Sequence, residues 1–388
     1  MGHAVPPPSG NFAVGRTVRE WTDAARVDPY AADPSERRSL VAWVWYPRDR
    51  TSGEAVADYL PAAWQPAGQM LGIRTAGLSA QSTDGGAVAR DRPAYPVVLL
   101  SPSGFPPLLL SATAEELASH GFVVVGVNHT YETAVTVFSD GRTVTMNPAA
   151  IAGALGPQAG AYRDVFARRA EVCRYKAGDL GFIADRLAQL DAGDPLAGRL
   201  DLSRLAAVGH SFGGAAALQW CRDDPRCTAA ANLDGALWTE VGQLGLARPV
   251  LQLLARHHEF DVTPDEAVQA GMAPDPEWFI TEKAITLGGW ETVDRTGHPA
   301  YSLQIAGATH LSFMDVPFLP LEEDSPVRSM LAATTIEPAT MREIMGVLLV
   351  AFLSGEDMAE AMASDPVRAT TSRITPQEAG GSAAPERR

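Results

Sequence analysis

The most regular feature of the sequence is a set of short apolar runs separated by segments of helical pattern. Residues 97–100 and 122–127 are continuous apolar runs, as a strand buried on both faces requires. Between them, a capping box at Thr113 and Glu116 predicts a helix, and Gly121 ends it. A strand, a helix and a second strand within about 30 residues form a βαβ unit, which predicts a parallel sheet.

The same pattern extends along most of the chain. Apolar runs and one-sided apolar spacings predict further strands and helices. The strands are expected at residues 41–47, 205–208, 228–233, 249–254 and 301–305, and the helices at residues 162–190 and 341–353. The chain is therefore expected to fold as an α/β domain with a mostly parallel central sheet flanked by helices.

The two ends of the chain lack this periodicity. Residues 1–35 are rich in Pro, Ala and Asp and predict an extended lead-in, so the folded domain is placed at residues 36–355. Residues 356–388 carry few apolar side chains and are expected to form a disordered tail, above all beyond about residue 370. Within the domain, residues 259–299 are predicted to be an insertion and a candidate lid or pocket wall.

Residues 209–213 read Gly-His-Ser-Phe-Gly and match the pattern G-x-S-x-G. This pattern is weak alone, but here a predicted strand precedes it and a run of small residues opens a helix after it. A nucleophile elbow needs this layout, because the tight strand-to-helix turn lifts the serine hydroxyl out of the sheet. The helix N-terminus also favours developing negative charge. Ser211 is therefore predicted to be the nucleophile of a serine hydrolase with the α/β-hydrolase fold.

A serine hydroxyl needs a base to remove its proton, and eight histidines are candidates. His310 follows the last predicted strand through a Gly-Ala-Thr loop, which places it at the carboxyl edge of the sheet. The chain order Ser, acid, His of this fold puts the base there. His129 follows a strand upstream of the serine, and it is kept only as a candidate for the substrate pocket.

Two regions compete for the acid that orients the base. Asp234 directly follows the strand predicted at residues 228–233. In many enzymes of this fold the acid follows a later strand, which leaves Glu259 and Asp261 as alternatives. Asp234 is preferred, because the other two lie several residues beyond their strand and have the character of loop residues that face water.

The oxyanion hole is predicted to consist of main-chain donors. One is the N–H of Phe212, directly after the nucleophile, and the other is the N–H of Phe105, on the turn that follows residues 97–100. Four aromatic residues beside the predicted site are candidates for the walls of a partly apolar pocket, although core packing explains each of them equally well. They are Phe105, Phe212, Trp238 and Phe313.

Three segments together resemble the platelet-activating-factor acetylhydrolase family, whose bacterial relatives include lipases and polyester hydrolases. They are Gly-His-Ser-Phe-Gly-Gly at residues 209–214, Asn-Leu-Asp-Gly at residues 232–235, and Gly-Ala-Thr-His-Leu-Ser-Phe at residues 307–313. The resemblance covers roughly residues 40–355. It implies an esterase that needs no metal and often acts on short or oxidised acyl chains, and it implies Asp234 as the acid. The family's usual His-Gly oxyanion turn is replaced here by Ser103-Gly104-Phe105.

These residues predict a serine carboxylic-ester hydrolase that acts through an acyl-enzyme on short- or medium-acyl esters or phospholipid-like esters. The same triad also supports acyl transfer, or lactone or amide chemistry in a biosynthetic pathway, and the sequence does not separate these outcomes. A binding protein that kept only the fold is disfavoured, because the triad geometry is costly to maintain without use.

The composition limits the classes of binding partner but does not indicate the reaction. The net charge of −15 argues against nucleic acid and anionic membranes, so a small-molecule ester is the expected partner, and the oligomeric state stays open. No apolar run reaches the roughly 18 residues of a membrane span. The chain shows no signal-peptide pattern, which slightly favours a cytoplasmic location over a secreted mature form and leaves the compartment open.

Cysteine and histidine spacing bears on cofactors and on crosslinks. No cysteine or histidine cluster has metal-ligand spacing, so neither a metal nor an organic cofactor is expected. Cys221 and Cys227 bracket a short turn and could pair if the protein is secreted. The alternative is that they are two ordinary small residues.

Overall fold

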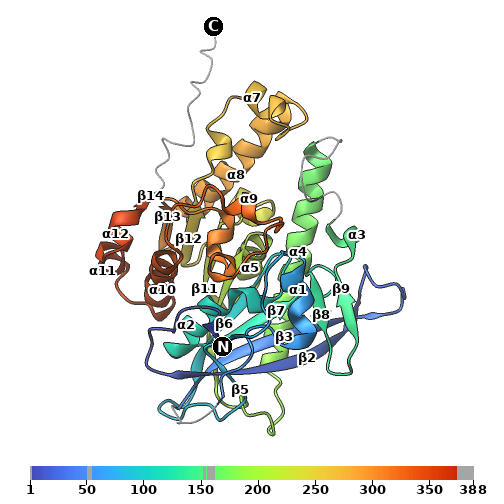
Figure 1. The fold of residues 1–388 in the computed structure, drawn as a ribbon, viewed down its shortest axis with the longest axis vertical. Coiled ribbons are helices and arrows are strands. Elements are labelled where there is room, and N and C mark those ends of the chain that lie inside the picture. Colours follow the sequence, from blue (N-terminus) through green and yellow to red (C-terminus); the bar gives the residue numbers. More distant parts are fainter. Residues whose placement is uncertain (1, 50–54, 152–153, 155–161, 374–388) are drawn as a thin grey trace.

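A ten-stranded sheet forms the centre of the molecule (Figure 1). The structure is a computed structural model that describes residues 2–49, 55–151, 154 and 162–373. Within these residues the strands lie in the order β14-β13-β12-β11-β10-β6-β7-β3-β2-β5, and the block from β13 to β7 is parallel. The strands are β2 (Ala13–Val27), β3 (Arg37–Arg48), β5 (Thr83–Asp84), β6 (Tyr95–Ser101), β7 (Val123–Asn128), β10 (Leu200–His210), β11 (Cys227–Leu233), β12 (Val250–Ala255), β13 (Ala300–Ile305) and β14 (Thr371–Arg373).

The remaining elements surround this sheet. Two further strand pairs are β1 (Gly2–His3) with β4 (Leu78–Ser79), and β8 (Val135–Val137) with β9 (Thr143–Thr145). The helices are α1 (Gln65–Gln69), α2 (Ser111–Ser119), α3 (Pro148–Ile151), α4 (Tyr162–Leu187), α5 (Phe212–Asp223), α6 (Glu240–Leu244), α7 (Pro264–Gln269), α8 (Pro276–Thr296), α9 (Arg328–Leu331), α10 (Pro338–Ser354), α11 (Met358–Ala363) and α12 (Val367–Thr370). Short 3-10 helices are η1 (Ala62–Trp64), η2 (Pro107–Leu110), η3 (His258–Phe260), η4 (His310–Phe313) and η5 (Val316–Phe318). No helix in the described part of the chain is both long and apolar enough to cross a bilayer.

Apolar side chains alternate across the sheet and build one core on each face. Val98 and Leu100 of β6 point into a cluster that includes α2 and α10, whereas Val97 and Leu99 point into a cluster that includes α4, α5 and α8. All four side chains are fully buried. This two-sided burial explains why the central strands are continuous apolar runs, and why the sequence predicted them where they occur.

The first helix after β6 differs from the prediction in how it begins. α2 starts at Ser111, and its N-cap residue Leu110 makes no side-chain cap. Glu116, predicted to complete a capping box, instead accepts from the backbone N–H of Ser9 at 3.0 Å and from Arg342 at 2.9 Å. This carboxylate therefore ties the N-terminal segment and α10 to α2.

The predicted N-terminal boundary near residue 35 is wrong. Residues 13–27 are not a lead-in but the long strand β2, which pairs antiparallel with β3 along nearly its whole length. β2 lies near the edge of the sheet and mixes buried and exposed positions. It therefore carries no apolar run that would mark it as a strand.

The predicted C-terminal boundary at residue 355 is also wrong. Residues 358–373 form α11, α12 and β14, and the side chains of Met358 and Val367 are buried in the core beside α10. β14 pairs antiparallel with β13. The remainder of the predicted disordered tail, residues 374–388, lies outside the described residues.

The insertion predicted at residues 259–299 is only partly an insertion. The later part of α8 is the crossover helix between β12 and β13, with Trp290 and Val293 buried in the core of the sheet. α7 and the start of α8 rise away from the sheet around a small apolar cluster of their own, which includes Trp278 (Figure 1). The projecting segment is therefore shorter than the sequence suggested.

Cys221 and Cys227 form a disulfide between the end of α5 and the start of β11. Cys173 is a buried free thiol on α4. The disulfide joins the helix that follows Ser211 to the strand that ends before Asp234.

Candidate active site

Ser211 occupies the turn between β10 and α5, and its backbone has a conformation that residues other than glycine seldom adopt. Its φ is 58° and its ψ is −126°. The N–H of Ser211 donates to Leu233 O at 3.0 Å, and the Ser211 carbonyl accepts from the N–H groups of Gly214 and Ala215. A strained serine between a parallel strand and a helix is the arrangement of a nucleophile elbow.

Two glycines of the elbow are required by close approach. A Cβ on Gly209 would lie 2.1 Å from Gly213 O, and a Cβ on Gly213 would lie 2.0 Å from Ser101 O. The first turn of α5 therefore packs directly against the end of β6. Ser101 and Pro102, which precede the segment with Phe105, are the residues that this first turn meets.

Asp234 lies at the end of β11, and its carboxylate is enclosed by three donors. It is 2% exposed and has a φ of 56°. Oδ2 accepts from His310 Nδ1 at 2.7 Å, and Oδ1 accepts from Ala255 N at 2.8 Å and from His257 Nε2 at 3.0 Å. Burial alone would raise the pKa of Asp234, but the charge of His257 and the hydrogen bonds from both histidines hold it well below its usual range.

His310 begins η4, on the loop after β13. Its side chain is 37% exposed, and its ring centroid lies 4.6 Å from that of His210, the residue before Ser211. His210 Nε2 donates to the backbone carbonyl of His310 at 3.0 Å. Burial and the neighbouring His310 lower the pKa of His210 to about 3, so His210 is a neutral donor that fixes the His310 loop to the elbow.

The predicted pocket aromatics divide into two groups. Phe212 and Trp238 have ring centroids 4.8 Å apart, and each retains a little exposure, at 9% and 8%. Phe105 is half-buried on the turn that follows β6. Phe313 is 1% exposed and stacks on His210, which favours core packing, one of the two alternatives that the sequence left open for this residue.

His129 was predicted as a pocket candidate, but its side chain is fully buried and has no surface to offer a substrate. Its Nδ1 lies 2.8 Å from Asp179 Oδ2 and its Nε2 lies 3.0 Å from Ser101 Oγ. Burial and the charge of Lys176 lower the pKa of His129 to about 3. The neutral ring therefore donates to Asp179 and accepts from Ser101.

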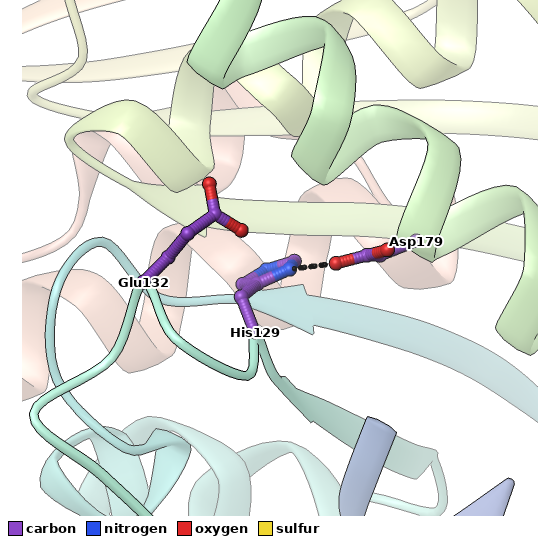
Figure 2. A group of neighbouring side chains, drawn as sticks. All are labelled: His129, Glu132 and Asp179. Atoms are coloured by element: carbon purple, nitrogen blue, oxygen red, sulfur yellow. Dashed lines mark hydrogen bonds and ion pairs between the residues drawn. The ribbon is translucent and has the colours of Figure 1, made fainter. Parts of the chain in front are cut away.

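Within the described residues, one group has the spacing of metal ligands: His129, Glu132 and Asp179 (Figure 2). The contacts around it do not fit a metal. Both nitrogens of His129 are engaged, and Arg38 forms ion pairs with Asp179 at 2.6 Å and with Glu132 at 3.0 Å. The guanidinium already occupies the place of a cation among these carboxylates, so the group is a buried ion network.

His257 is the residue of the site that sequence reasoning missed. The sequence pattern gave His257 no role, and the nearby Glu259 entered only as an alternative acid. Both lie at the carboxyl edge, where β12 pairs with β11 in parallel register. A histidine just past a strand adjacent to the acid's strand was the available signal, because parallel neighbours end at the same edge of a sheet.

Comparisons with known proteins test the family resemblance that the sequence motifs suggested. The sequence model of the family described as "Platelet-activating factor acetylhydrolase, isoform II" matches residues 189–365. A probable 1-alkyl-2-acetylglycerophosphocholine esterase of Arthroderma benhamiae is 26% identical over 287 residues, which cover 66% of this chain and 66% of that protein. The platelet-activating factor acetylhydrolase of Cavia porcellus is 31% identical over 160 residues, covering 36% and 35%. The predicted family resemblance is confirmed.

The match to the acetylhydrolase family includes Ser211, Asp234 and His310, because all three lie within residues 189–365. The chain matches only part of the length of each curated relative, as the covered shares show. A ferulic acid esterase from Streptomyces cinnamoneus has a similar structure, with a TM-score of 0.74 and 26% identity, over 97% of this chain and 100% of that one. The α/β-hydrolase fold is confirmed, and the predicted class of ester hydrolase agrees with the names of these relatives.

Proposed function

We propose that this protein is a serine carboxylic-ester hydrolase in which Ser211 is the nucleophile, His310 the base and Asp234 the acid. The observation that carries the proposal is the 2.7 Å contact between His310 Nδ1 and buried Asp234, beside a serine strained at a strand-to-helix turn. Asp234 is ionised near neutral pH, because its pKa is held below its usual range. It accepts Nδ1–H and leaves Nε2 of His310 free to accept a proton.

The reaction begins when Ser211 Oγ attacks the ester carbonyl and His310 Nε2 takes the hydroxyl proton. The carbonyl oxygen of the tetrahedral intermediate is negatively charged, and it accepts hydrogen bonds from the N–H groups of Phe212 and Phe105. Cleavage of the C–O bond releases the alcohol, which receives the proton from His310, and leaves Ser211 acylated. Water, deprotonated by His310, then attacks the acyl-enzyme. The bond between the acyl carbon and Ser211 Oγ breaks, His310 returns the proton to Oγ, and the acid is released.

Two classes of acyl group are candidates. Short- or medium-chain esters and phospholipid-like esters follow from the acetylhydrolase relatives. Esters of aromatic acids are the second candidate, because the structural match to a ferulic acid esterase spans 97% of the chain and Phe212, which directly follows the nucleophile, packs against the ring of Trp238. An apolar ring pair accepts a planar acyl group by stacking.

A fluorophosphonate probe tests the proposal without knowledge of the natural ester. The wild-type protein is expected to form one covalent adduct, and mass spectrometry of the digested protein is expected to place it on Ser211. Turnover of aryl acetate, aryl butyrate and methyl ferulate then ranks the two acyl classes. An unlabelled Ser211 with no turnover of any of these esters would refute the proposed function.

A further inference from the structure

We propose that His257 is a positioning residue of this site: a charged imidazole that holds the second oxygen of Asp234 and sets the pH range over which His310 acts as a base. The inference rests on the function proposed above. Its structural basis is that one carboxylate serves two histidines, with Oδ2 facing His310 at 2.7 Å and Oδ1 facing His257 at 3.0 Å.

His257 is itself held between two carboxylates. Its Nε2 contacts Asp234, and its Nδ1 lies 2.5 Å from Glu259 Oε1. A neutral imidazole has one donor and one acceptor nitrogen, whereas an imidazolium donates from both. Only the charged ring satisfies both carboxylates, and its side chain is 18% exposed, so water weakens these contacts little.

The surroundings of His257 favour a fixed, charged ring. Its ring centroid lies 5.1 Å from that of Trp290 on α8 and 5.9 Å from that of Phe260 in η3. The other nearby charges are directed elsewhere, because Lys283 on α8 donates to the Phe260 carbonyl at 2.6 Å and His258 contacts Asp261 at 3.2 Å.

Arg256 precedes His257 in the sequence, but its side chain pairs with Asp261 at 3.3 Å. The charge of His257 is therefore set by its two carboxylate partners. Burial lowers the pKa of His257, but Asp234 and Glu259 outweigh that effect and raise it to about 10. The ring therefore stays protonated across the neutral range.

The positive charge of the His257 ring lies beside Oδ1 of Asp234. It offsets part of the carboxylate charge that Asp234 presents to the His310 ring through Oδ2. It also anchors the carboxylate together with the N–H of Ala255, which keeps Oδ2 aimed at His310 Nδ1. His257 thus acts on the reaction through Asp234 and needs no contact with substrate.

Two replacements separate the charge of His257 from its hydrogen bond. His257→Gln keeps a neutral donor within reach of Asp234, and it is expected to move the acidic limb of the kcat/KM profile up by about 0.5 to 1 pH unit, because a nearby positive charge is lost. His257→Leu removes the donor as well, and kcat/KM at the optimum is expected to fall a further tenfold or so, the usual effect of one lost buried hydrogen bond. Glu259→Gln is expected to move the limb slightly in the opposite direction.

His258→Gln is the matched control, because His258 is the exposed neighbour and is expected to leave the profile unchanged. The rate of fluorophosphonate labelling of Ser211, measured as a function of pH, reports the same acidic limb and needs no known substrate. Nitrogen-15 NMR of the histidine rings supplies a readout that needs no activity: a doubly protonated ring at pH 8 is expected in the wild type and absent in His257→Gln. An unmoved limb in a folded His257→Gln protein, or a neutral His257 ring at pH 8, overturns the inference, whereas an unlabelled wild-type Ser211 refutes the proposed function alone.

A second set of contacts involves the turn after β6, which carries Phe105, the proposed second oxyanion donor. From these contacts we infer that Lys176 is a positioning residue for that turn. Lys176 on α4 is fully enclosed, and its Nζ donates to Ser103 O at 3.0 Å. Ser103 lies two residues before Phe105 in the sequence. The inference likewise rests on the proposed function, because it assigns Phe105 N–H to the oxyanion hole.

A buried series of hydrogen bonds also fixes the start of this turn, at the end of β6. Ser101, the last residue of β6, donates to His129, which donates to Asp179 on α4. Figure 2 shows His129 lying between Asp179 and Glu132. The side chains of Ser101, His129 and Asp179 are all fully buried, so no ester can reach them. These hydrogen bonds therefore serve to fix the end of β6.

Lys176 lies among buried charged groups. Burial lowers the pKa of Lys176 below its usual value, and the charges of Glu132 and Asp179 offset that effect only in part. Lysine occurs at only two positions in this arginine-rich sequence, 176 and 283. A compact ammonium reaches a single carbonyl in a closed space where a planar guanidinium would need more room.

Lys176→Met is expected to lower kcat by about 10- to 100-fold while KM changes by less than about threefold, because oxyanion donors act mainly on the transition state. Arg174→Met, on the exposed face of the same helix, is the matched control and is expected to leave both constants unchanged. Ser101→Ala, which removes only a hydroxyl, is expected to lower kcat about threefold to tenfold, and it tests the turn if Lys176→Met does not fold.

The labelling rate of Ser211 by a fluorophosphonate is expected to fall in parallel with kcat, since the phosphonyl oxygen occupies the same donors. Full kcat and full labelling rate in folded Lys176→Met, or in Ser101→Ala where the former does not fold, would exclude a role for this network in the oxyanion turn. A stoichiometric metal in the purified protein, lost on replacement of His129, would likewise contradict the inference. Failure of wild-type Ser211 to react at all counts against the proposed function instead.

Discussion

Replacement of Ser211 by alanine is expected to lower kcat by about five to six decades, as the loss of a triad nucleophile does in other serine hydrolases. Without Oγ no acyl-enzyme forms, and water must attack the bound ester directly. The oxyanion donors and the bound geometry stay in place, so a small residual rate above that of water is expected. KM is expected to change little, because Oγ contributes chiefly to the transition state.

The measurement is initial rates on an aryl ester, together with fluorophosphonate labelling and a thermal melt. Alanine retains the Cβ at a residue whose φ is 58°, so it neither relieves nor adds backbone strain, and the melting temperature is expected to stay near that of the wild type. Ser203→Ala, on the exposed part of β10, is the matched control and is expected to keep full activity. Undiminished hydrolysis by a pure, folded Ser211→Ala protein would remove the serine mechanism.

The elements that the sequence predicted well share one physical property, which is burial on both faces. β6 and β7 lie inside the sheet, so their apolar runs are visible without any partner. β12 is also buried, and only Gln252 interrupts its apolar residues. The elbow at Ser211 was also predictable, since its glycines are required by the backbone of the turn itself and lie within five residues of sequence.

The elements that were mispredicted depend on partners far along the chain. β2 is a strand because β3 offers it a register of hydrogen bonds, and its own residues mix polar and apolar types. The segment after residue 355 packs because α10 and β13 leave apolar surface and an edge for it. Neither partner surface is visible in the local pattern.

The same distinction applies within the site. Asp234 was placed from its position at a strand end, but its second histidine was missed because their contact joins two strand ends 23 residues apart. The pairing of His129 with Asp179 spans 50 residues. Local patterns therefore indicated which residues carry the chemistry, while the contacts that tune those residues needed the packed fold.

Replacement of Asp234 by asparagine is expected to lower kcat about ten-thousandfold near neutral pH, through the tautomer of His310. In the variant, the amide oxygen is expected to take the place of Asp234 Oδ1. In the wild type this atom accepts from Ala255 N at 2.8 Å and from the charged His257 ring at 3.0 Å, and both donors still need an acceptor. The amide NH2 then faces His310 Nδ1. A nitrogen that faces a donor must be the unprotonated one, so the proton moves to Nε2, and His310 no longer accepts from Ser211.

The competing acids provide the control for this assignment. Glu259 reaches the site only through His257, and Asp261 pairs with Arg256 and His258 at the surface. Glu259→Gln and Asp261→Asn are therefore expected to keep kcat within about threefold of the wild type, as replacements at exposed ion pairs usually do. Aryl-ester kinetics on the three variants decide the matter, because a ten-thousandfold loss in Glu259→Gln or Asp261→Asn, with Asp234→Asn active, would place the acid after β12 instead of β11.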